Sequence, residues 1–272
     1  MTTAAKPVAL VTGASSGIGR AAASALVMAG FEVIGTSRNT SGVAPLDGVG
    51  FLDLDVTSDE SVSLAVAQVI ERFGRLDVLV NNAGTGAAGA AEESSVAQDQ
   101  RVFDINFFGL VRMTKAVLPH LRAAGHGRIV NISSVLGLVP APFMASYAAT
   151  KHAIEGYSES VDHEVREHGI RVLLVEPAWT RTALDAKAIQ PDAPLPVYAQ
   201  QRRTFDGVIA RAMADGDDPA IVAKVIVAAA TDPKPKLRYT AGSTAGRVST
   251  FRRFAPGRVF DGQIRKLNRL PA

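Results

Sequence analysis

Short apolar runs rich in β-branched residues alternate along the chain with longer stretches in which apolar residues recur every three or four positions. The short runs predict strands and the longer stretches predict helices, because the two structures repeat their side-chain directions with different periods. Strands that alternate with helices indicate one parallel sheet covered by helices on both faces. The predicted strands cover residues 8–11, 33–36, 51–54, 76–80, 128–132, 171–175 and 237–240.

The longer stretches carry local helix signals. Residues 20–29 follow the first strand, Ser58 precedes residues 62–73 as an N-cap, and residues 146–168 contain no proline. The chain therefore predicts a single doubly wound α/β domain over residues 1–244 with about seven strands. A proline-containing segment, about 178–216, is expected to form a lid above the sheet.

Charge separates the last segment from the rest of the chain. Of 29 Lys and Arg residues, seven lie in residues 245–272, where Asp261 is the single acidic residue, so this segment carries +6. The whole chain carries +3, which leaves −3 for residues 1–244. A nucleic-acid protein would show basic residues across its main fold, so we expect no nucleic-acid partner.

Apolar residues recur at three- and four-residue steps in the same segment, which predicts a basic, amphipathic helical C-terminal extension. Such a helix either docks its apolar stripe on the domain, as we favour, or lies on an anionic membrane surface. The residues of the stripe are Phe251, Phe254, Phe260, Ile264, Leu267 and Leu270.

Composition excludes several classes of protein. The 272 residues are 47% apolar, which supplies a sizeable core, and the absence of Cys excludes disulfide scaffolds, thiolate zinc sites and thiol nucleophiles. Residues 1–6 lack the features of a signal peptide, and no stretch approaches ~18 uncharged apolar residues. We therefore expect a cytoplasmic protein.

A glycine-rich turn, Thr-Gly-Ala-Ser-Ser-Gly-Ile-Gly over residues 12–19, joins the first strand to the first helix. Gly13 permits a tight exit from the strand, Gly17 lets a pyrophosphate approach the backbone, and Gly19 allows close helix packing. An ordinary turn is the alternative, but the position after the first strand favours a Rossmann-type dinucleotide site on the helix N-terminus. Its predicted coenzyme contacts are Gly13, Ser15, Ser16, Gly17, Ile18 and Gly19.

The end of the second strand indicates which dinucleotide binds. NAD-binding proteins carry an acidic residue there for the ribose hydroxyl, whereas this chain has Ser37 and Arg38. Ser37 can hydrogen-bond a 2′-phosphate and Arg38 can pair with it, so we expect NADP to be favoured over NAD. The alternative is that Arg38 is a solvated surface charge.

Tyr147 and Lys151 stand four residues apart in a predicted helix, so both project from one face. A nearby ammonium stabilises phenolate and lowers the pKa of a tyrosine from about 10, which suits it to proton transfer near neutral pH. Taken alone, the pair could equally be two surface residues of a helix. The surrounding motifs favour chemistry.

Seven motifs along the chain, in order, resemble those of the classical short-chain dehydrogenase/reductase family. The resemblance covers residues 8 to about 182 and implies nicotinamide-dependent redox chemistry on a Rossmann-type fold. The motifs are residues 12–19, Asp55, residues 81–84 (Asn-Asn-Ala-Gly), Asn106, residues 132–134 (Ile-Ser-Ser), residues 147–151 (Tyr-Ala-Ala-Thr-Lys) and Pro177.

The resemblance implies a role for each catalytic residue. Tyr147 is the acid/base at the carbonyl oxygen, and Ser134 holds that oxygen, with the adjacent Ser133 as the competing candidate. Lys151 binds the nicotinamide ribose and depresses the pKa of Tyr147. Asn106 holds a water that links Lys151 to solvent, and no metal is needed.

The resemblance also implies further coenzyme contacts. Asp55 contacts the adenine amino group. Thr180 or Thr182 hydrogen-bonds the carboxamide or the pyrophosphate, and we favour Thr180. The usual Pro-Gly after the sixth strand is Pro-Ala here, which we expect to change the carboxamide position only slightly. Asn81 is expected to stabilise the sheet. The remaining predicted contacts are Val56, Asn82, Ala83, Gly84, Tyr147, Lys151, Pro177 and Ala178.

Substrate specificity is expected to come from residues 136–144, from residues 178–213 and from the extension, which are mostly apolar. They favour a hydrophobic ketone or alcohol, although each residue singly fits core packing as well. Residues 151–156 and the pair Arg238-Tyr239 resemble the hydroxysteroid and retinol dehydrogenase branch of the family. The predicted substrate contacts are Ser134, Leu136, Phe143, Met144, Tyr147 and Trp179.

These observations predict an NADP-dependent oxidoreductase that interconverts a hydrophobic alcohol and its ketone or aldehyde. An acyl-thioester ketoreductase is the enzymatic alternative, and a non-catalytic NADP-binding sensor or scaffold is the alternative from another class. The full set Asn106, Ser134, Tyr147 and Lys151 argues against the sensor, which has no need of acid/base groups. The resemblance further implies a homodimer or homotetramer through the helices that carry Asn106 and Tyr147.

Overall fold

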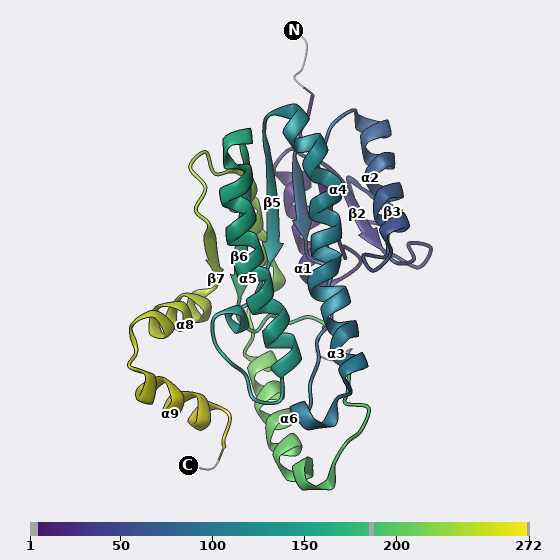
Figure 1. The fold of residues 1–272 in the computed structure, drawn as a ribbon. Helices are drawn as coiled ribbons and strands as arrows, with labels where there is room; N and C mark the ends of the chain where they lie inside the picture. The colour runs from purple at the N-terminus through teal and green to yellow at the C-terminus, as the bar shows by residue number, and fades with distance from the viewer. Residues whose placement is uncertain (1–4, 185–187, 271–272) are drawn as a thin grey trace.

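A computed structural model describes residues 5–184 and 188–270, and its centre is a parallel sheet with the order β3-β2-β1-β4-β5-β6-β7 (Figure 1). Every neighbouring pair of strands is parallel, which confirms the predicted sheet of about seven strands. The strands are β1 (Val8–Val11), β2 (Glu32–Ser37), β3 (Val49–Asp53), β4 (Val78–Asn81), β5 (Gly127–Ile132), β6 (Ile170–Pro177) and β7 (Arg238–Ala241).

Helices cover both faces of the sheet, as the alternating pattern predicted. Buried residues of α1 and α7 pack with one set of strand residues, and those of α2, α4 and α5 pack with the other. The long helices are α1 (Gly17–Met28), α2 (Asp59–Phe73), α3 (Val96–Phe103), α4 (Gly109–Ala124), α5 (Ala145–Val165), α6 (Ala199–Ala214), α7 (Pro219–Thr231), α8 (Ser243–Phe254) and α9 (Gly257–Leu267).

The strand order reverses between β1 and β4, which makes the fold doubly wound. From β1 the chain moves outward through β2 and β3, then returns to β4 on the other side of β1. In such folds the ligand crevice lies beyond the carboxyl ends of the strands at this reversal. The strand arrows in Figure 1 point toward the end of the molecule where α6 lies, so this end holds the candidate site.

Local sequence signals explain several helix ends. The Ser58 hydroxyl accepts a hydrogen bond from the Ser61 N–H at 3.2 Å and caps α2 as predicted, and Gly74 ends that helix in the left-handed conformation. The helix predicted over residues 146–168 is α5 followed by one short 3-10 turn, η4 (Arg166–His168).

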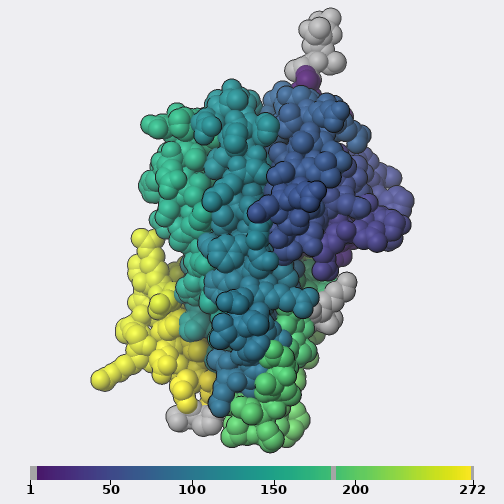
Figure 2. Space-filling model, turned by 45° about the vertical axis from the view of Figure 1, so that its right-hand side comes forward, coloured from purple at the N-terminus to yellow at the C-terminus, as the bar shows by residue number. Residues whose placement is uncertain are grey.

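The basic segment after β7 forms two helices, α8 and α9, that lie outside the sheet layers (Figures 1 and 2). Ala245 and Phe260 are buried against residues of the 135–148 region, so part of the apolar stripe docks on the domain. Among the residues that the structure describes, no helix has the length and apolar character required to cross a membrane.

Candidate active site

The glycine-rich turn has the backbone geometry that its sequence requires. Gly13 and Gly17 have φ angles of +67° and +56°, a region that favours glycine. A Cβ atom on Gly19 would lie 2.4 Å from both the Asn82 side-chain nitrogen and the Gly13 carbonyl oxygen. Glycine is therefore required at all three positions, and the backbone N–H groups at the start of α1 stay open to an anion.

Hydrogen bonds from β1 and β4 hold this turn in place. The Thr12 hydroxyl accepts from the Asn82 and Ala83 N–H groups at 3.0 and 2.9 Å, and the Asn82 side chain donates to the Thr12 and Gly13 carbonyls at 2.9 and 3.2 Å. The Asn82 side chain thus braces the glycine turn, a role that was not predicted, and the predicted ribose contact of Asn82 stays a prediction. Gly84 lies against Asn106, whose Oδ1 would be 3.2 Å from an added Cβ.

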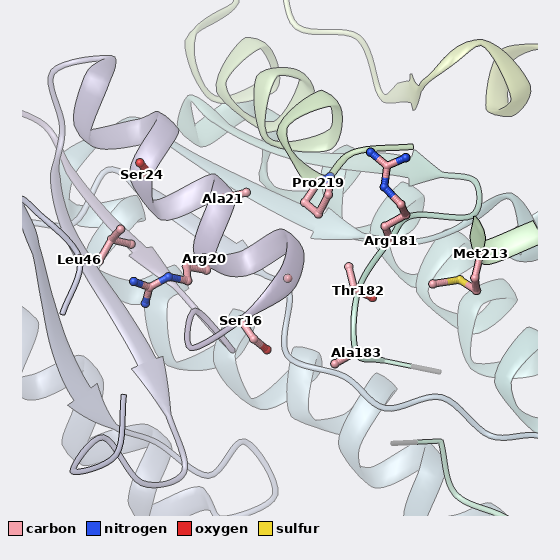
Figure 3. Close-up of a pocket in the computed structure, with 11 residues that line it drawn as sticks. Ser16, Arg20, Ala21, Ser24, Leu46, Arg181, Thr182, Ala183, Met213 and Pro219 are labelled. Carbon is pink, nitrogen blue, oxygen red and sulfur yellow. The ribbon is translucent and has the colours of Figure 1, made fainter. Parts of the chain in front are cut away.

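The start of α1 borders a cavity of about 720 Å³ (Figure 3). Ser16 is the exposed N-cap of α1, makes no side-chain capping bond and lines this cavity together with Gly17 of the helix N-terminus. Arg20 lines the α1 side of the cavity and Thr182 lines the opposite side. Ser15 and Ile18, on either side of this turn, are half-buried.

The carboxyl ends of β2 and β3 hold the residues predicted at the adenosine end. Ser37 is half-buried and Arg38 is exposed. Asp55 accepts from the Thr57 N–H at 2.9 Å and from its hydroxyl at 2.7 Å, and Val56 is buried next to Gly109. The Thr57 N–H chiefly holds the pKa of Asp55 below its usual value, and the nearby Arg38 adds to this effect.

The helix α5 brings Tyr147 and Lys151 together as their spacing predicted. The Lys151 ammonium lies 5.6 Å from the centroid of the Tyr147 ring and donates to the Ile132 carbonyl at 2.8 Å. Burial lowers the pKa of Lys151 from 10.5 to about 8, and the neighbouring Glu155 opposes this shift. The ammonium is thus held by the end of β5 in a dry environment.

Two adjacent serines end β5 and face different surroundings. The Ser134 hydroxyl lies 3.5 Å from the Pro177 carbonyl and accepts from the Leu136 N–H at 3.1 Å, at the start of the short helix η3 (Val135–Gly137). The Ser133 hydroxyl is buried beneath that helix, where a Cβ on Gly137 would meet it at 2.7 Å. The Ser134 hydroxyl therefore lies beside the segment that follows β6.

Asn106 lies in a π-helical turn, η2 (Asp104–Phe108), a feature often found at functional sites. Its side chain accepts from the Thr85 N–H at 2.8 Å and donates to the Thr85 carbonyl at 2.9 Å. It also donates to the Thr150 hydroxyl at 3.3 Å. Asn106 therefore joins the loop after β4 to α5 at the residue that precedes Lys151.

The segment after β6 turns across the carboxyl ends of the strands. Pro177 is buried and Ala178 is half-buried, and the Thr180 hydroxyl donates to the Ala178 carbonyl at 3.1 Å. Thr182 lies against Gly17, with side-chain atoms 3.2 Å and 3.3 Å from an added Cβ. The predicted lid therefore begins directly over the glycine turn.

The residues predicted to contact substrate, apart from Ser134, share one apolar cluster. It joins η3, α5, the segment after β6, α6 and both C-terminal helices, and the rings of Phe143 and Phe205 lie 5.5 Å apart. Each of these residues was predicted singly as a substrate contact, and the packing of distant segments brings them together. The predicted substrate contacts within the cluster are Leu136, Phe143, Met144, Tyr147 and Trp179.

A buried ionic group behind Lys151 was not predicted. Arg238 of β7 lies 3.0 Å from Glu155 of α5 and 3.4 Å from Glu176 of β6. Burial raises the pKa of Glu176 to about 7, with the Glu155 charge as the second cause. The sequence signals that could have found this group are Glu155 four residues after Lys151 and Glu176 directly before Pro177.

Comparison with known sequences agrees with this arrangement. A 3-ketodihydrosphingosine reductase from Bacteroides thetaiotaomicron is 46% identical over 168 residues, which is 62% of each chain. The dehydrogenase/reductase SDR family member 7B of Bos taurus is 32% identical over 267 residues, covering 93% of this chain and 79% of the relative.

Solved structures show the same fold. A short-chain dehydrogenase from Streptomyces avermitilis superposes with a TM-score of 0.85 at 37% identity, covering 98% of this chain and 99% of that one. A Burkholderia phymatum family member in complex with NAD has a TM-score of 0.78 at 26% identity, covering 93% and 94%. The structure described as ElxO with NADP bound has a TM-score of 0.73 at 26% identity, covering 89% and 99%.

The family profile described as short chain dehydrogenase matches residues 7–193, which include the glycine turn, the Tyr147 helix and the segment after β6. The motifs, the sheet order and the relatives agree with this match, including a relative from the dehydrogenase/reductase branch that the sequence resembles. The chain belongs to the classical short-chain dehydrogenase/reductase family and is an oxidoreductase with a nucleotide-binding Rossmann fold.

Proposed function

We propose that the protein is an NADP-dependent oxidoreductase that interconverts a hydrophobic alcohol and its ketone or aldehyde. The observation that carries the proposal is the buried Lys151 ammonium 5.6 Å from the Tyr147 ring, beside the apolar cluster. The Bacteroides relative is a reductase of a keto compound, which supports this reaction class for the present chain.

The residues present fit a dinucleotide. The positive φ angles at Gly13 and Gly17 expose backbone N–H groups, and the uncapped α1 N-terminus at Ser16 suits a pyrophosphate. Arg38 next to Asp55 supports a 2′-phosphate contact, since no acidic residue follows β2 directly. The bound nicotinamide would supply or accept the hydride, and Pro177, Ala178 and Thr180 would hold its carboxamide end.

Side chains of the protein would carry out the proton transfer that accompanies hydride transfer. Tyr147 gives a proton to the carbonyl oxygen during reduction and takes it back during oxidation. Lys151 stabilises the resulting phenolate through its charge, and Asn106 fixes the start of the path that returns a proton to Lys151. Ser134 would hydrogen-bond the carbonyl oxygen. Its hydroxyl lies 3.5 Å from the Pro177 carbonyl, whereas that of Ser133 is buried beneath η3, which favours Ser134.

The segment about 178–216 would close over the substrate, and residues 1–244 with the extension 245–272 would act as one unit. The substrate would contact the apolar residues that the cluster gathers. We also propose a cytoplasmic homodimer or homotetramer formed through η2, α4 and α5. The half-exposed Phe108 beside Phe107, at a ring distance of 5.2 Å, supports an aromatic contact there.

The decisive experiment follows the loss of reduced-nicotinamide absorbance with NADPH or NADH across steroid, retinoid, alicyclic and acyl-thioester carbonyls. Wild type is expected to turn over an apolar carbonyl with NADPH, and Tyr147→Phe is expected to lose at least about a hundredfold in turnover. Ser134→Ala is expected to lose more activity than its matched control Ser133→Ala.

Coenzyme binding separates the alternatives. Retained NADPH affinity in Tyr147→Phe, with turnover lost, supports the acid/base role. Preference for acyl thioesters over every apolar ketone would instead identify the acyl-thioester ketoreductase. Tight NADPH binding by wild type with no turnover of any carbonyl would contradict the proposal and favour a sensor.

A further inference from the structure

The C-terminal helices leave part of their apolar surface uncovered. In α9, Phe260 and Ile264 pack into the apolar cluster of the domain, whereas Val259 and Leu267 are 51% and 67% exposed. Val259 and Leu267 lie on one face with Gln263, because these residues are four apart in a helix. Docking therefore covers only one side of the stripe.

The helix α8 repeats this division. Ala245 is buried and Val248 packs against the domain, but Phe254 is 74% exposed. Phe254 shares its face with Arg247 and Thr250, at steps of three and four residues. A shallow cavity runs along this face and is lined by Ser243, Gly246, Arg247, Thr250 and Phe251. The exposed side of α8 thus combines an aromatic ring, hydroxyl groups and a guanidinium.

Positive charge surrounds these apolar side chains. Five exposed basic residues lie in α8, α9 and the chain after them, and among the described residues none of the five forms an ion pair with an acidic side chain. The acidic residue of the extension, Asp261, lies two positions from both Val259 and Gln263 and so projects away from their face. The exposed basic residues are Arg247, Arg253, Arg258, Lys266 and Arg269.

We propose that the outer faces of α8 and α9 bind the surface of an anionic lipid bilayer. Phe254, Val259 and Leu267 would enter the boundary between headgroups and acyl chains, and the surrounding cations would pair with lipid phosphates. Figure 2 shows the extension standing out from the body of the molecule, so a flat surface can reach it. The inference goes beyond the proposed reaction and does not depend on it.

A protein partner fits this surface less well. The exposed apolar side chains are separated by arginines and a lysine, so a dry protein interface would have to bury those cations with a matching set of acids. In a bilayer interface the long basic side chains keep their charges at the headgroups while the apolar side chains go deeper. A second copy of the chain remains as an outcome that the experiment detects.

The inner faces of α8 and α9 connect the proposed bilayer contact to the proposed substrate site. Arg252 donates to the Leu138 carbonyl at 3.1 Å and lies 4.6 Å from the centroid of the Phe260 ring. Phe260 in turn shares the apolar cluster with Leu136 and Trp179. Bilayer contact would therefore bring the end of the molecule with the proposed substrate site to the lipid surface.

The test is co-sedimentation of the full chain with vesicles of phosphatidylcholine alone or of equimolar phosphatidylcholine and phosphatidylglycerol. Wild type is expected to bind the anionic vesicles, to lose binding as salt rises, and to ignore the neutral ones. The double variant Phe254→Ser with Leu267→Ser is expected to bind at least tenfold more weakly. Arg253→Gln is expected to lose about fivefold.

Matched controls replace exposed residues elsewhere. Met28→Ser removes an 80% exposed apolar side chain at the end of α1, and Arg122→Gln removes an exposed charge at the end of α4. Both are expected to bind like wild type, and all variants should keep the wild-type melting temperature. Equal sedimentation of wild type and the double variant would overturn the proposal. So would loss of a dimer in the double variant by analytical ultracentrifugation without any vesicle binding by wild type.

Discussion

Two groups of polar residues at the carboxyl ends of the strands differ in character. Those around the glycine turn, which we call the coenzyme side, are neutral and bonded to one another. Lys151, Glu155 and Glu176, which we call the catalytic side, are buried and ionisable. On the coenzyme side, Thr12 and Asn82 exchange bonds of 2.9 to 3.2 Å with the glycine turn. Deeper in the sheet, Asn81 of β4 donates to Asn131 of β5 at 2.9 Å.

The catalytic side has the opposite character. Burial lowers the pKa of Lys151 to about 8 and raises that of Glu176 to about 7. Among the described residues, neither carboxylate oxygen of Glu176 has a hydrogen-bond partner, although Arg238 lies 3.4 Å away. Buried ionisable groups with shifted pKa values are typical of functional sites. The coenzyme side therefore supplies geometry without buried titratable groups, whereas the catalytic side holds groups whose pKa values burial shifts toward neutral pH.

The largest expected effect tests the catalytic side through the pH dependence of stability. Between pH 8 and 10.5, Lys151 is neutral in the folded state and still charged in the unfolded state, so unfolding takes up a proton. We expect the free energy of unfolding of wild type, relative to Lys151→Met, to rise across this window by about 3 kcal/mol. Urea denaturation of the coenzyme-free protein at a series of pH values measures it.

An exposed lysine provides the control for this experiment. Lys224 lies on the exposed side of α7, so wild type relative to Lys224→Met should show no such rise between pH 8 and 10.5. A difference between wild type and Lys151→Met that stays constant with pH would show that the ammonium is well solvated. The difference in buried ionisable groups between the catalytic side and the coenzyme side would then be contradicted.

A smaller effect, without pH dependence, is expected on the coenzyme side. Thr12→Val removes the oxygen that accepts from the Asn82 and Ala83 N–H groups and leaves both half-buried donors without this partner. This should cost about 2 kcal/mol of unfolding free energy, equally at pH 7 and pH 9. The matched control is Thr231→Val at the exposed end of α7, where we expect a change within about 0.5 kcal/mol. A pH-dependent cost at Thr12 would contradict the comparison.

The sequence predicted polar motifs well because their neighbours along the chain determine their geometry. The spacing of Tyr147 and Lys151 on one helix, and the glycines that need positive φ, are local properties. The ionic group of Glu155, Glu176 and Arg238 was missed because its members come from three elements that meet only in the folded sheet.

For apolar residues, too, contacts between distant segments could not be predicted from the sequence. Their sequence pattern indicates which side chains are buried, but not which distant segment covers them. The packing of Phe205 from α6 and Phe260 from α9 into one cluster with Trp179 could therefore not be derived. The bracing role of Asn82 was also missed, since a polar residue at a strand end predicts a ligand contact as readily as a bond to a neighbouring loop.

The smallest expected effect concerns the preference for NADPH over NADH, which the charge of Arg38 on the coenzyme side should determine. Arg38 is exposed at the end of β2 and close enough to Asp55 to lower its pKa. A guanidinium paired with a 2′-phosphate contributes about 1.5 kcal/mol, so Arg38→Ala should weaken NADPH binding about tenfold and leave NADH binding unchanged. Arg122→Ala is the control, because Arg122 is exposed at the end of α4 and does not line the cavity at the start of α1. Fluorescence titration of both coenzymes measures the affinities, and an equal loss for NADPH and NADH in Arg38→Ala would mean that Arg38 supports the loop rather than the phosphate.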